Sequence, residues 1–450
     1  MPSIMWFRRD LRLHDNPALL RAVEAGSGSV VGVFVLDPVL WDAGGPVRHA
    51  YLTSSLRALD ASMGGRLLIL QGDPRVEIPA LAQRIKATSV HIASDFGNHF
   101  APMDLEIEAA LGPIALERTG SVHAVAPGAI RKDDGTPYRV FTPYYKAWLR
   151  HGWHGPAADA PRDIDWIRPE DGIPMPNAAA PHGMSLPDAG EAAAWLQWAR
   201  FRERGATTYA DDRNRPDLDR TSRMSVPLHW GEIHPRSLLA ELDEGDDAWR
   251  RQLCWRDFYG DVLFHNPRSQ FHSLDARFDE ASLWEGGPDA EAAFNAWAEG
   301  RTGYPFVDAG MRQLRAEGWM HNRVRMVVAS FLVKDLHLPW QRGAREFMTW
   351  LVDGDPANNA HGWQWTAGCG TDASPFYRVF NPVGQGQKFD PDGDYVRRYV
   401  PELRHLAGAS VHEPWLAPDG HAHGYPERIV DHAAERLVAL AMLEQLKSIR

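Results

Sequence analysis

SIMWFRRDLRLHDNPALL, residues 3–20, is the stretch that decides the fold of the first part of this chain. The apolar run Ser3–Phe7 has the length and composition of a buried strand. Asn16 and Pro17 then supply an N-cap and a first-turn proline, which predict a helix to about Ala25. A strand that leads into a helix in this way is the first half of a βαβ unit.

The same alternation continues over the first 125 residues. Further strand-like runs lie at Ser29–Leu36, Arg66–Leu70, Ser89–Ala93 and Ile114–Leu116. Helical patterns separate most of them, such as Val47–Met63 and Glu77–Ala87. Strands joined by helical crossovers pair in parallel. We therefore predict an α/β domain over residues 1–125, with a doubly wound parallel sheet.

The turn after the first strand, Arg8 to Asp15, contains no glycine. A dinucleotide-binding turn needs glycines there, because the backbone must approach the pyrophosphate closely. The nearest GxG, Gly26-Ser27-Gly28, precedes the second strand and is on the wrong side. This excludes an NAD site at this turn.

The remainder of the chain reads as a connection followed by helices. Residues 126–187 are rich in Pro, Gly, Ala and Asp, which predicts a long inter-domain connection on the surface. Helical periods then dominate, and we predict an all-helical domain over residues 188–450. The clearest helical stretches are Glu191–Arg204, Ser237–Leu242, Asp247–Leu263, Ala290–Glu299, Asp308–Glu317, Asn322–Leu336, Gly343–Val352 and Ala433–Lys447.

Composition limits the classes of function. Two cysteines, Cys254 and Cys369, exclude a disulfide framework, and the paired histidines His151/His154 and His421/His423 lie in Gly/Pro-rich loops. We therefore predict no metal site, no membrane span and a cytoplasmic protein. The net charge of -11 argues against a nucleic-acid partner unless the cations gather in one local groove.

Three polar stretches are candidates for a binding site, and each has a simpler structural explanation. Tyr209–Ser225 places hydroxyls and an arginine before a helix, which suits a phosphate or a plain N-cap. Asp353–Trp365 combines acids, amides and tryptophans, which suits a ring-shaped ligand or a polar loop. Gly318–Met326 holds two arginines on different helix faces, which suits an anion contact or a solvated basic patch.

Six motifs in order resemble the photolyase/cryptochrome family over nearly the whole chain, and most closely its class I cyclobutane pyrimidine dimer photolyases. They are WFRRDLRLHDNPAL (6–19), TSRMS (221–225), CWRDFY (254–259), GRTGYPFVDAGMRQL (300–314), GWMHNRVRMVVASFLVKDL (318–336) and WQW–GTD–FNP (363–382). The family fold agrees with the α/β and helical domains read from the residues. The resemblance implies a monomeric, FAD-dependent photo-lyase that repairs pyrimidine dimers in DNA under blue light.

The resemblance also assigns residues to the FAD site. Those expected to hold the phosphates are Tyr209, Thr221, Ser222, Arg223, Met224 and Ser225, with Trp249 and Arg256 nearby. Those expected to line the isoalloxazine are Asn322, Asp353, Asp355 and Asn359, and Gln252 and Arg325 are also counted as cofactor-binding. Arg325 is expected to pair with Asp353, and Asn359 to face flavin N5, where an amide influences which reduced state persists.

Three tryptophans correspond to the electron-hopping chain of the family: Trp363 beside the flavin, then Trp340, then Trp284 outermost. The chain holds 18 tryptophans, and burial in an aromatic core is the simpler explanation for any one of them. A substrate pocket for a flipped-out dimer would use Gln252, Trp255, Asn322, Arg323, Met326 and Trp365.

One departure from the family pattern bears on activity. The pocket glutamate of the dimer photolyases falls at Gln252, which can donate and accept a hydrogen bond but cannot transfer a proton. We therefore expect retained but less efficient repair. The departure also favours the alternative function, a blue-light receptor cryptochrome without repair activity, although the short C-terminus disfavours it.

Two further sets follow from the resemblance. Arg48 and Asp95 match positions that bind an antenna pigment, and they favour 8-hydroxy-5-deazaflavin over methenyltetrahydrofolate, with an empty pocket as the alternative. DNA contacts are expected from Arg213, Arg378 and Lys388, whose local positive potential must overcome the acidic remainder of the chain.

Overall fold

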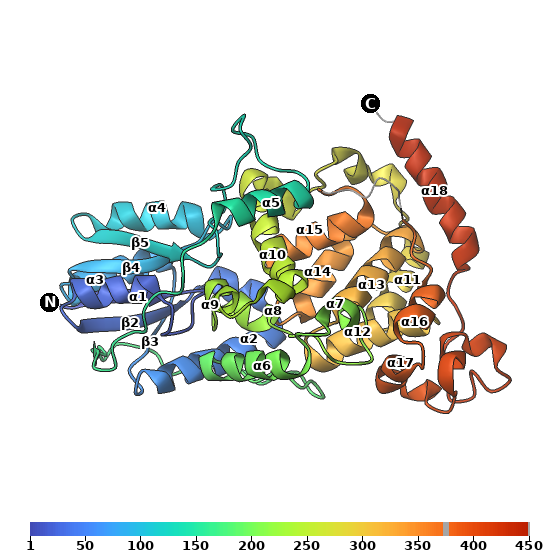
Figure 1. Ribbon diagram of the computed structural model, residues 1–450, viewed down its shortest axis with the longest axis horizontal. Coiled ribbons are helices and arrows are strands. Elements are labelled where there is room, and N and C mark those ends of the chain that lie inside the picture. The colour runs from blue at the N-terminus through green and yellow to red at the C-terminus, as the bar shows by residue number, and fades with distance from the viewer. Residues whose placement is uncertain (372–377, 449–450) are drawn as a thin grey trace. The chain divides into compact units, whose positions relative to one another are not determined.

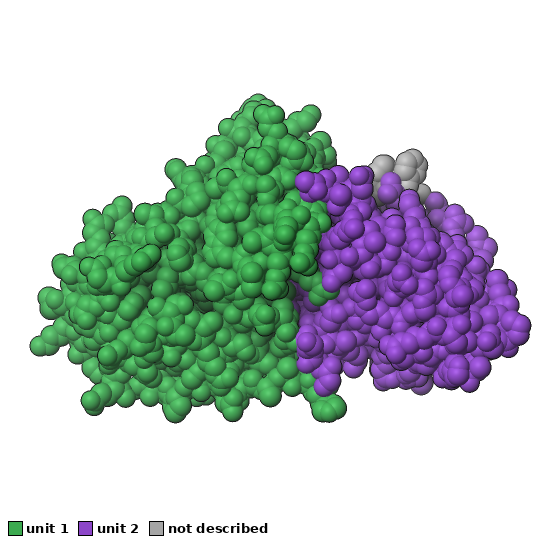
Figure 2. Space-filling model, turned by 60° about the horizontal axis from the view of Figure 1, so that its bottom comes forward, with its two compact units in different colours: residues 1–182, 186–206, 222–267 green, residues 183–185, 207–221, 268–450 purple. Residues whose placement is uncertain are grey.

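The computed structural model describes residues 1–371 and 378–448, and Figure 1 traces their helices and strands. The chain divides into two compact units, which Figure 2 shows in different colours. The first comprises residues 1–182, 186–206 and 222–267, and the second comprises residues 183–185, 207–221 and 268–450. The boundaries of these units differ from the predicted domain boundaries. The predicted boundaries stay a prediction.

The first unit is built on a parallel sheet, as the sequence predicts. Its strands are β1 (Ser3–Phe7), β2 (Ser29–Leu36), β3 (Leu68–Gln71), β4 (Ser89–Ser94) and β5 (Ala115–Ser121), and the short β6 (Asp165–Trp166) pairs with β2. The order β3-β2-β1-β4-β5 reverses its direction at β1, so the sheet is doubly wound. All five residues of β1 are buried, because helices cover a parallel sheet on both faces.

The helices of the first unit are α1 (Pro17–Ala25), α2 (Pro38–Ser62), α3 (Pro74–Arg84), α4 (Phe100–Leu111), α5 (Phe141–His151), α6 (Glu191–Arg204), α8 (Ser225–Trp230), α9 (Pro235–Ala240) and α10 (Asp247–His265). Helix α1 begins as predicted, with the Asn16 side chain accepting a hydrogen bond from the Leu19 amide. Helix α2 has a kink at Gly45, where φ is 71°, so the predicted start at Val47 marks its second segment. Helices α4 and α5 were not expected from the sequence, and α5 lies within the predicted connection.

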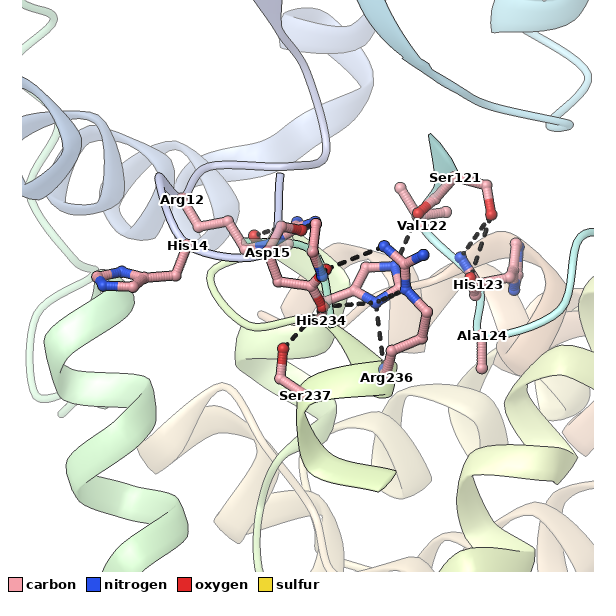
Figure 3. Close-up of polar contacts among 12 residues, drawn as sticks. Arg12, His14, Asp15, Ser121, Val122, His123, Ala124, His234, Arg236 and Ser237 are labelled. Atoms are coloured by element: carbon pink, nitrogen blue, oxygen red, sulfur yellow. Dashed lines mark hydrogen bonds and ion pairs between the residues drawn. The ribbon is translucent and has the colours of Figure 1, made fainter. Parts of the chain in front are cut away.

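The loop between β1 and α1 is anchored by Asp15, a buried residue in the left-handed region with φ of 45° (Figure 3). The Asp15 carboxylate accepts hydrogen bonds from Arg236 Nη2 at 3.0 Å and from Ser237 Oγ at 2.8 Å. Both donors lie on α9. The motif that decides the α/β fold is therefore also bonded to a helix more than two hundred residues later in the chain.

His234 caps α9 beside this carboxylate. Its Nδ1 accepts hydrogen bonds from the backbone N–H and the Nε–H of Arg236, each at 3.1 Å. Its Nε2 lies 2.8 Å from the carbonyl oxygen of Ser121 and must donate to it (Figure 3). The network therefore fixes a neutral imidazole with its proton on Nε2.

The second unit contains only helices among its described residues, in agreement with the predicted helical region. They are α7 (Tyr209–Asp212), α11 (Pro288–Ala298), α12 (Pro305–Glu317), α13 (Asn322–Lys334), α14 (Trp340–Trp350), α15 (Pro356–Ala367), α16 (Pro382–Phe389), α17 (Asp394–Tyr399) and α18 (His432–Ser448). One large apolar core joins α12 to α15 and buries Trp297, Trp340 and Trp363. Within the part of the chain that is described, no helix has both the length and the apolar character needed to cross a membrane.

Candidate flavin and substrate site

The residues predicted for the FAD and substrate sites lie in both compact units, and each set is described within its own unit. The first unit carries Ser222, Arg223, Met224, Ser225, Trp249, Gln252, Trp255 and Arg256. The second unit carries Tyr209, Thr221, Trp284, Asn322, Arg323, Arg325, Met326, Trp340, Asp353, Asp355, Asn359, Trp363 and Trp365.

The segment before α8 has the features of an anion site. Ser222 Oγ accepts a hydrogen bond from Trp249 Nε1 at 3.2 Å, and the Ser222 carbonyl accepts one from Gln197 Nε2 at 2.8 Å. Arg223 has φ of 52°, a left-handed conformation that a non-glycine residue keeps only where its surroundings hold it. Helix α8 begins at Ser225, and the Val226 amide of its first turn donates to the Arg223 carbonyl at 3.4 Å.

Two of the predicted substrate residues, Gln252 and Trp255, lie on the same face of α10. Gln252 and the half-buried Trp255 are one turn apart and share this face, and Gln252 Nε2 donates to the Ala248 carbonyl at 3.0 Å. Arg256 also bonds to the backbone, and its predicted place near the FAD phosphates stays a prediction. Its guanidinium donates to the carbonyls of Val122 at 2.6 Å and Leu228 at 3.2 Å.

The expected ion pair between Arg325 and Asp353 is present in the second unit. Arg325 Nη2 lies 3.1 Å from Oδ1 and 2.9 Å from Oδ2 of Asp353, and Arg325 Nε donates to the Met320 carbonyl at 2.8 Å. The Asp353 side chain is 2% exposed and that of Arg325 is 24% exposed. A charge buried this deeply is tolerated because it is paired and hydrogen-bonded.

The stretch around Asp355 and Asn359 is a helix start rather than the alternative polar loop. Asp355 caps α15 by accepting a hydrogen bond from the Asn358 amide at 2.9 Å. Asn359 Nδ2 donates to the Ala344 carbonyl at 2.9 Å, which fixes the orientation of its amide. Asn322 is exposed at the first turn of α13. The flavin contacts of these three residues stay a prediction.

Two buried polar atoms of the second unit test whether these residues fit FAD. Thr221 Oγ1 and Trp363 Nε1 have no hydrogen-bond partner among the described residues. Buried donors without a partner are costly, so each marks a place that a ligand group or a water completes. Both atoms belong to residues that the sequence assigns to the flavin side of the site, and they fit a ligand rich in acceptors, as FAD is.

The three tryptophans of the predicted electron-hopping chain share one core cluster. Trp363 packs edge to face against Phe347, with 4.9 Å between ring centroids, and a Cβ on Gly343 would overlap its ring. Trp340 lies one turn before Gly343 on α14, and its Nε1 donates to Ser273 Oγ at 2.9 Å.

The outermost member, Trp284, is partly buried and packs against the same cluster. Its Nε1 donates to the Phe278 carbonyl at 3.0 Å. Core packing and electron transfer are compatible in this arrangement, and the second role stays a prediction for all three residues.

Two cations of the second unit, Arg323 and Lys388, lie over one aromatic ring, and the charge of a third, Arg213, acts on Arg323. Arg323 donates to Asn214 Oδ1 from Nε at 3.1 Å and from Nη2 at 2.8 Å, and its guanidinium lies 4.6 Å from the Phe389 ring centroid. Lys388 Nζ lies 5.2 Å from the same ring. Burial, together with the nearby charge of Arg213, lowers the pKa of Arg323. This basic cluster is the local concentration of cations that an acidic chain needs for an anionic partner.

The remaining predicted residues are placed separately. Arg378 is exposed, and its carbonyl accepts a hydrogen bond from Lys334 Nζ at 2.5 Å. The aspartate of the GTD motif, Asp372, lies outside the described residues. Met326 follows Asn322 by one turn of α13, at 3.9 Å between Nδ2 and Sδ, and Trp365 is half-buried on α15.

The two antenna residues are both buried in the first unit. Burial lowers the pKa of Arg48 to about 10, and Arg48 Nη2 donates to the Ala43 carbonyl at 2.7 Å. Asp95 accepts a hydrogen bond from the Gly97 amide at 2.8 Å and lies 3.5 Å from Arg9 Nη1. Their fit to a pigment stays a prediction.

Comparison with known proteins places this geometry in a family. The model of the DNA photolyase domain matches residues 3–162, and that of the FAD binding domain of DNA photolyase matches residues 249–445. The deoxyribodipyrimidine photo-lyase of Streptomyces griseus is 40% identical over 454 residues, which cover 96% of this chain and 97% of that protein.

Two solved structures are similar over the full length. A bacterial class III photolyase from Agrobacterium tumefaciens has a TM-score of 0.89 and 36% identity, covering 99% of this chain and 98% of that one. A cryptochrome from Synechocystis has a TM-score of 0.85 and 26% identity, covering 98% of this chain and 99% of that one.

This chain belongs to the DNA photolyase family. It is an enzyme of that family and a flavoprotein with an FAD-binding domain, so the predictions of family, fold class and enzyme are confirmed.

Proposed function

We propose that this enzyme repairs cyclobutane pyrimidine dimers in DNA, using blue light absorbed by reduced FAD. The observation that carries the proposal is the shared face of α10, where the half-buried Trp255 lies one turn from Gln252. An aromatic face for stacking beside an amide for hydrogen bonding suits a flipped-out pair of bases. The proposal includes both the substrate, the cyclobutane pyrimidine dimer, and the assignment to the class I photolyases.

When bound and reduced, FAD would supply the electron that opens the cyclobutane ring and would take it back once the ring has split. The protein therefore has to bind and orient the reactants and shield them from water. The Ser222–Ser225 segment offers backbone amides and hydroxyls to a phosphate. The Arg325–Asp353 pair sets a fixed dipole within the second unit. Gln252 and Trp255 orient the dimer, and the basic cluster of Arg213, Arg323 and Lys388 attracts the DNA backbone.

Light-dependent repair is the direct test. The purified, reduced protein is mixed with UV-irradiated oligothymidine, and recovery of thymine absorbance is followed under blue light and in the dark. Recovery only in the light is the expected result. A reduced flavin spectrum without recovery would reject the repair function.

Replacing Gln252 with glutamate is expected to raise the rate of repair several-fold. A protonated carboxyl can donate to a thymine carbonyl as its charge develops, and hydrogen bonds to charged groups are roughly 1 kcal/mol stronger than neutral ones. The rate of light-dependent repair at limiting dimer measures the effect. Gln252→Leu, which removes donor and acceptor alike, should lower it. A lower rate in Gln252→Glu would contradict this role.

DNA binding is expected to weaken steeply with salt. Three phosphate contacts, from Arg213, Arg378 and Lys388, predict a loss of affinity of roughly 40-fold between 50 and 200 mM salt. Fluorescence anisotropy with labelled UV-irradiated DNA measures it. Lys388→Ala should lower the salt slope by about 1, whereas Arg204→Ala, which removes an exposed arginine outside the basic cluster, should leave it unchanged. An affinity independent of salt would argue against phosphate contacts.

A receptor role is the second candidate, and Gln252 in place of the pocket glutamate favours it. A light receptor would keep its FAD and its photoreduction but show no preference for dimer-containing DNA. The repair assay therefore separates the two functions.

We further propose that the first unit holds an antenna pigment of the deazaflavin type at Arg48 and Asp95. Both residues are buried and polar, so a guanidinium donor and a carboxylate acceptor could meet the polar groups of a bound ring. Reconstitution with 8-hydroxy-5-deazaflavin should add an absorbance band that Arg48→Leu abolishes. Equal binding by the variant would reject the assignment.

A further inference from the structure

Phe141 lies flat against Trp255 within the first unit. Their ring centroids are 3.7 Å apart and their planes differ by 6°, so Phe141 is stacked on one face of the indole. Phe141 is only 4% exposed, whereas Trp255 remains half-buried after this contact. A planar ring offers two faces for stacking, and Phe141 occupies one of those of Trp255. Phe258 and Tyr259 meet the indole at 73° and 48°, so Phe141 is its parallel stacking partner.

The helix that carries Phe141 is bound to α10 along one side. Phe141, Tyr145 and Trp148 are spaced so that they share a face of α5. The Tyr145 hydroxyl donates to Asp247, and Arg251 lies 4.3 Å from the centroid of the Tyr145 ring.

The end of α5 is held by a second buried contact. Trp148 Nε1 donates to the fully buried carboxylate of Asp257 at 3.0 Å. Asp257 also accepts a hydrogen bond from the Val125 amide at 3.0 Å. Helix α5 is therefore fixed at both ends against the helix that presents Gln252 and Trp255.

We propose that Phe141 is a positioning residue for substrate, which holds the indole of Trp255 in one plane and restricts base stacking to its opposite face. This rests on the proposed function, in which Trp255 contacts the dimer. The segment predicted to be an inter-domain connection would then contribute to substrate recognition. Phe141 acts through Trp255 and has no contact with the bases itself.

A double-mutant cycle tests the inference in the full-length, FAD-loaded protein. The affinity for an oligothymidine with one cyclobutane dimer, and for the same undamaged strand, is measured for wild type, Phe141→Leu, Trp255→Ala and the double variant. Phe141→Tyr keeps the stack and serves as the conservative rescue. Phe264→Leu is the matched control, because it also exchanges an aromatic ring for leucine, on the last turn of α10.

Phe141→Leu should weaken dimer binding roughly 3- to 10-fold, the range for loss of one stacked aromatic pair, with flavin content and undamaged-strand affinity unchanged. Phe141→Tyr and Phe264→Leu should bind as wild type does. In the Trp255→Ala background, Phe141→Leu should have no further effect.

If wild type prefers the dimer, two results would still overturn the inference. If Phe141→Leu weakens binding as much without Trp255 as with it, the role of Phe141 is general to the fold. If Phe141→Leu binds the dimer as wild type does, the stack does not orient the indole. Wild type without any preference for the dimer would reject the proposed function, and this inference with it.

Discussion

Arg325→Leu is expected to yield a protein that is destabilised by about 3–5 kcal/mol and purifies without flavin. The substitution leaves the Asp353 carboxylate 2% exposed and without its cation. It also removes the donor to the Met320 carbonyl, which positions the start of α13. The free energy of unfolding in urea and the ratio of flavin to protein absorbance measure the two effects.

A second variant separates the cost of the buried charge from the loss of the pair itself. Arg325→Leu/Asp353→Leu replaces both ions with apolar side chains, which is often close to neutral for stability. We expect it to regain most of the lost free energy while still lacking flavin. Arg342→Leu, which breaks a pair with the exposed Glu291, should cost less than about 1 kcal/mol. Full flavin content in Arg325→Leu would contradict the role of the pair.

The stabilisation that His234 gives is expected to disappear in acid. Burial, chiefly, and the neighbouring arginines lower the pKa of His234 to about 4, from an ordinary value of 6.5. The unfolded chain therefore takes up this proton first as the pH falls. The stabilisation is fully present above pH 6.5 and is lost as the pH falls through 4, in total about 3 kcal/mol.

The difference between wild type and His234→Gln isolates this effect. Other buried groups titrate in the same window, and Glu232, whose pKa burial raises to about 7, changes the stability in the opposite direction. Glutamine can still donate to Ser121 and accept from Arg236, so the variant should fold. The gap in unfolding free energy should shrink by about 3 kcal/mol between pH 6.5 and pH 4. His151→Gln, an exposed histidine, is the control. A gap that stays constant with pH would show that His234 is not held neutral.

The elements that the sequence predicts best are those with local signals. The α1 boundaries follow from the Asn16 cap and Pro17, and β2 and α6 have the predicted ends because apolar periods and glycines delimit them. Helix α5 escaped prediction because its four buried aromatic residues lie within a region dominated by Pro, Gly and Asp. Its stability comes from contacts with α10 rather than from local preference.

The candidate site likewise has features that the sequence predicts and features that only the structure reveals. Motif order supplied the residue types of the flavin and substrate sites, including the Arg325–Asp353 pair that the structure contains. Spacing alone does not reveal that Arg256 serves two backbone carbonyls, or that Asn214 holds Arg323. Such partners are distant in the chain, and each bond depends on side-chain direction.

By itself, the sequence determined the parallel α/β region, the helical region and the family, because strand and helix periods and six ordered motifs are local properties of the chain. Only the tertiary structure decided which groups are buried together. The neutral His234 beside Asp15 and the stack of Phe141 on Trp255 arise from that packing. So do Thr221 Oγ1 and Trp363 Nε1, which lack a hydrogen-bond partner among the described residues. Burial sets the cost of a charge or an unmet hydrogen bond, and it depends on contacts between residues that are far apart in sequence.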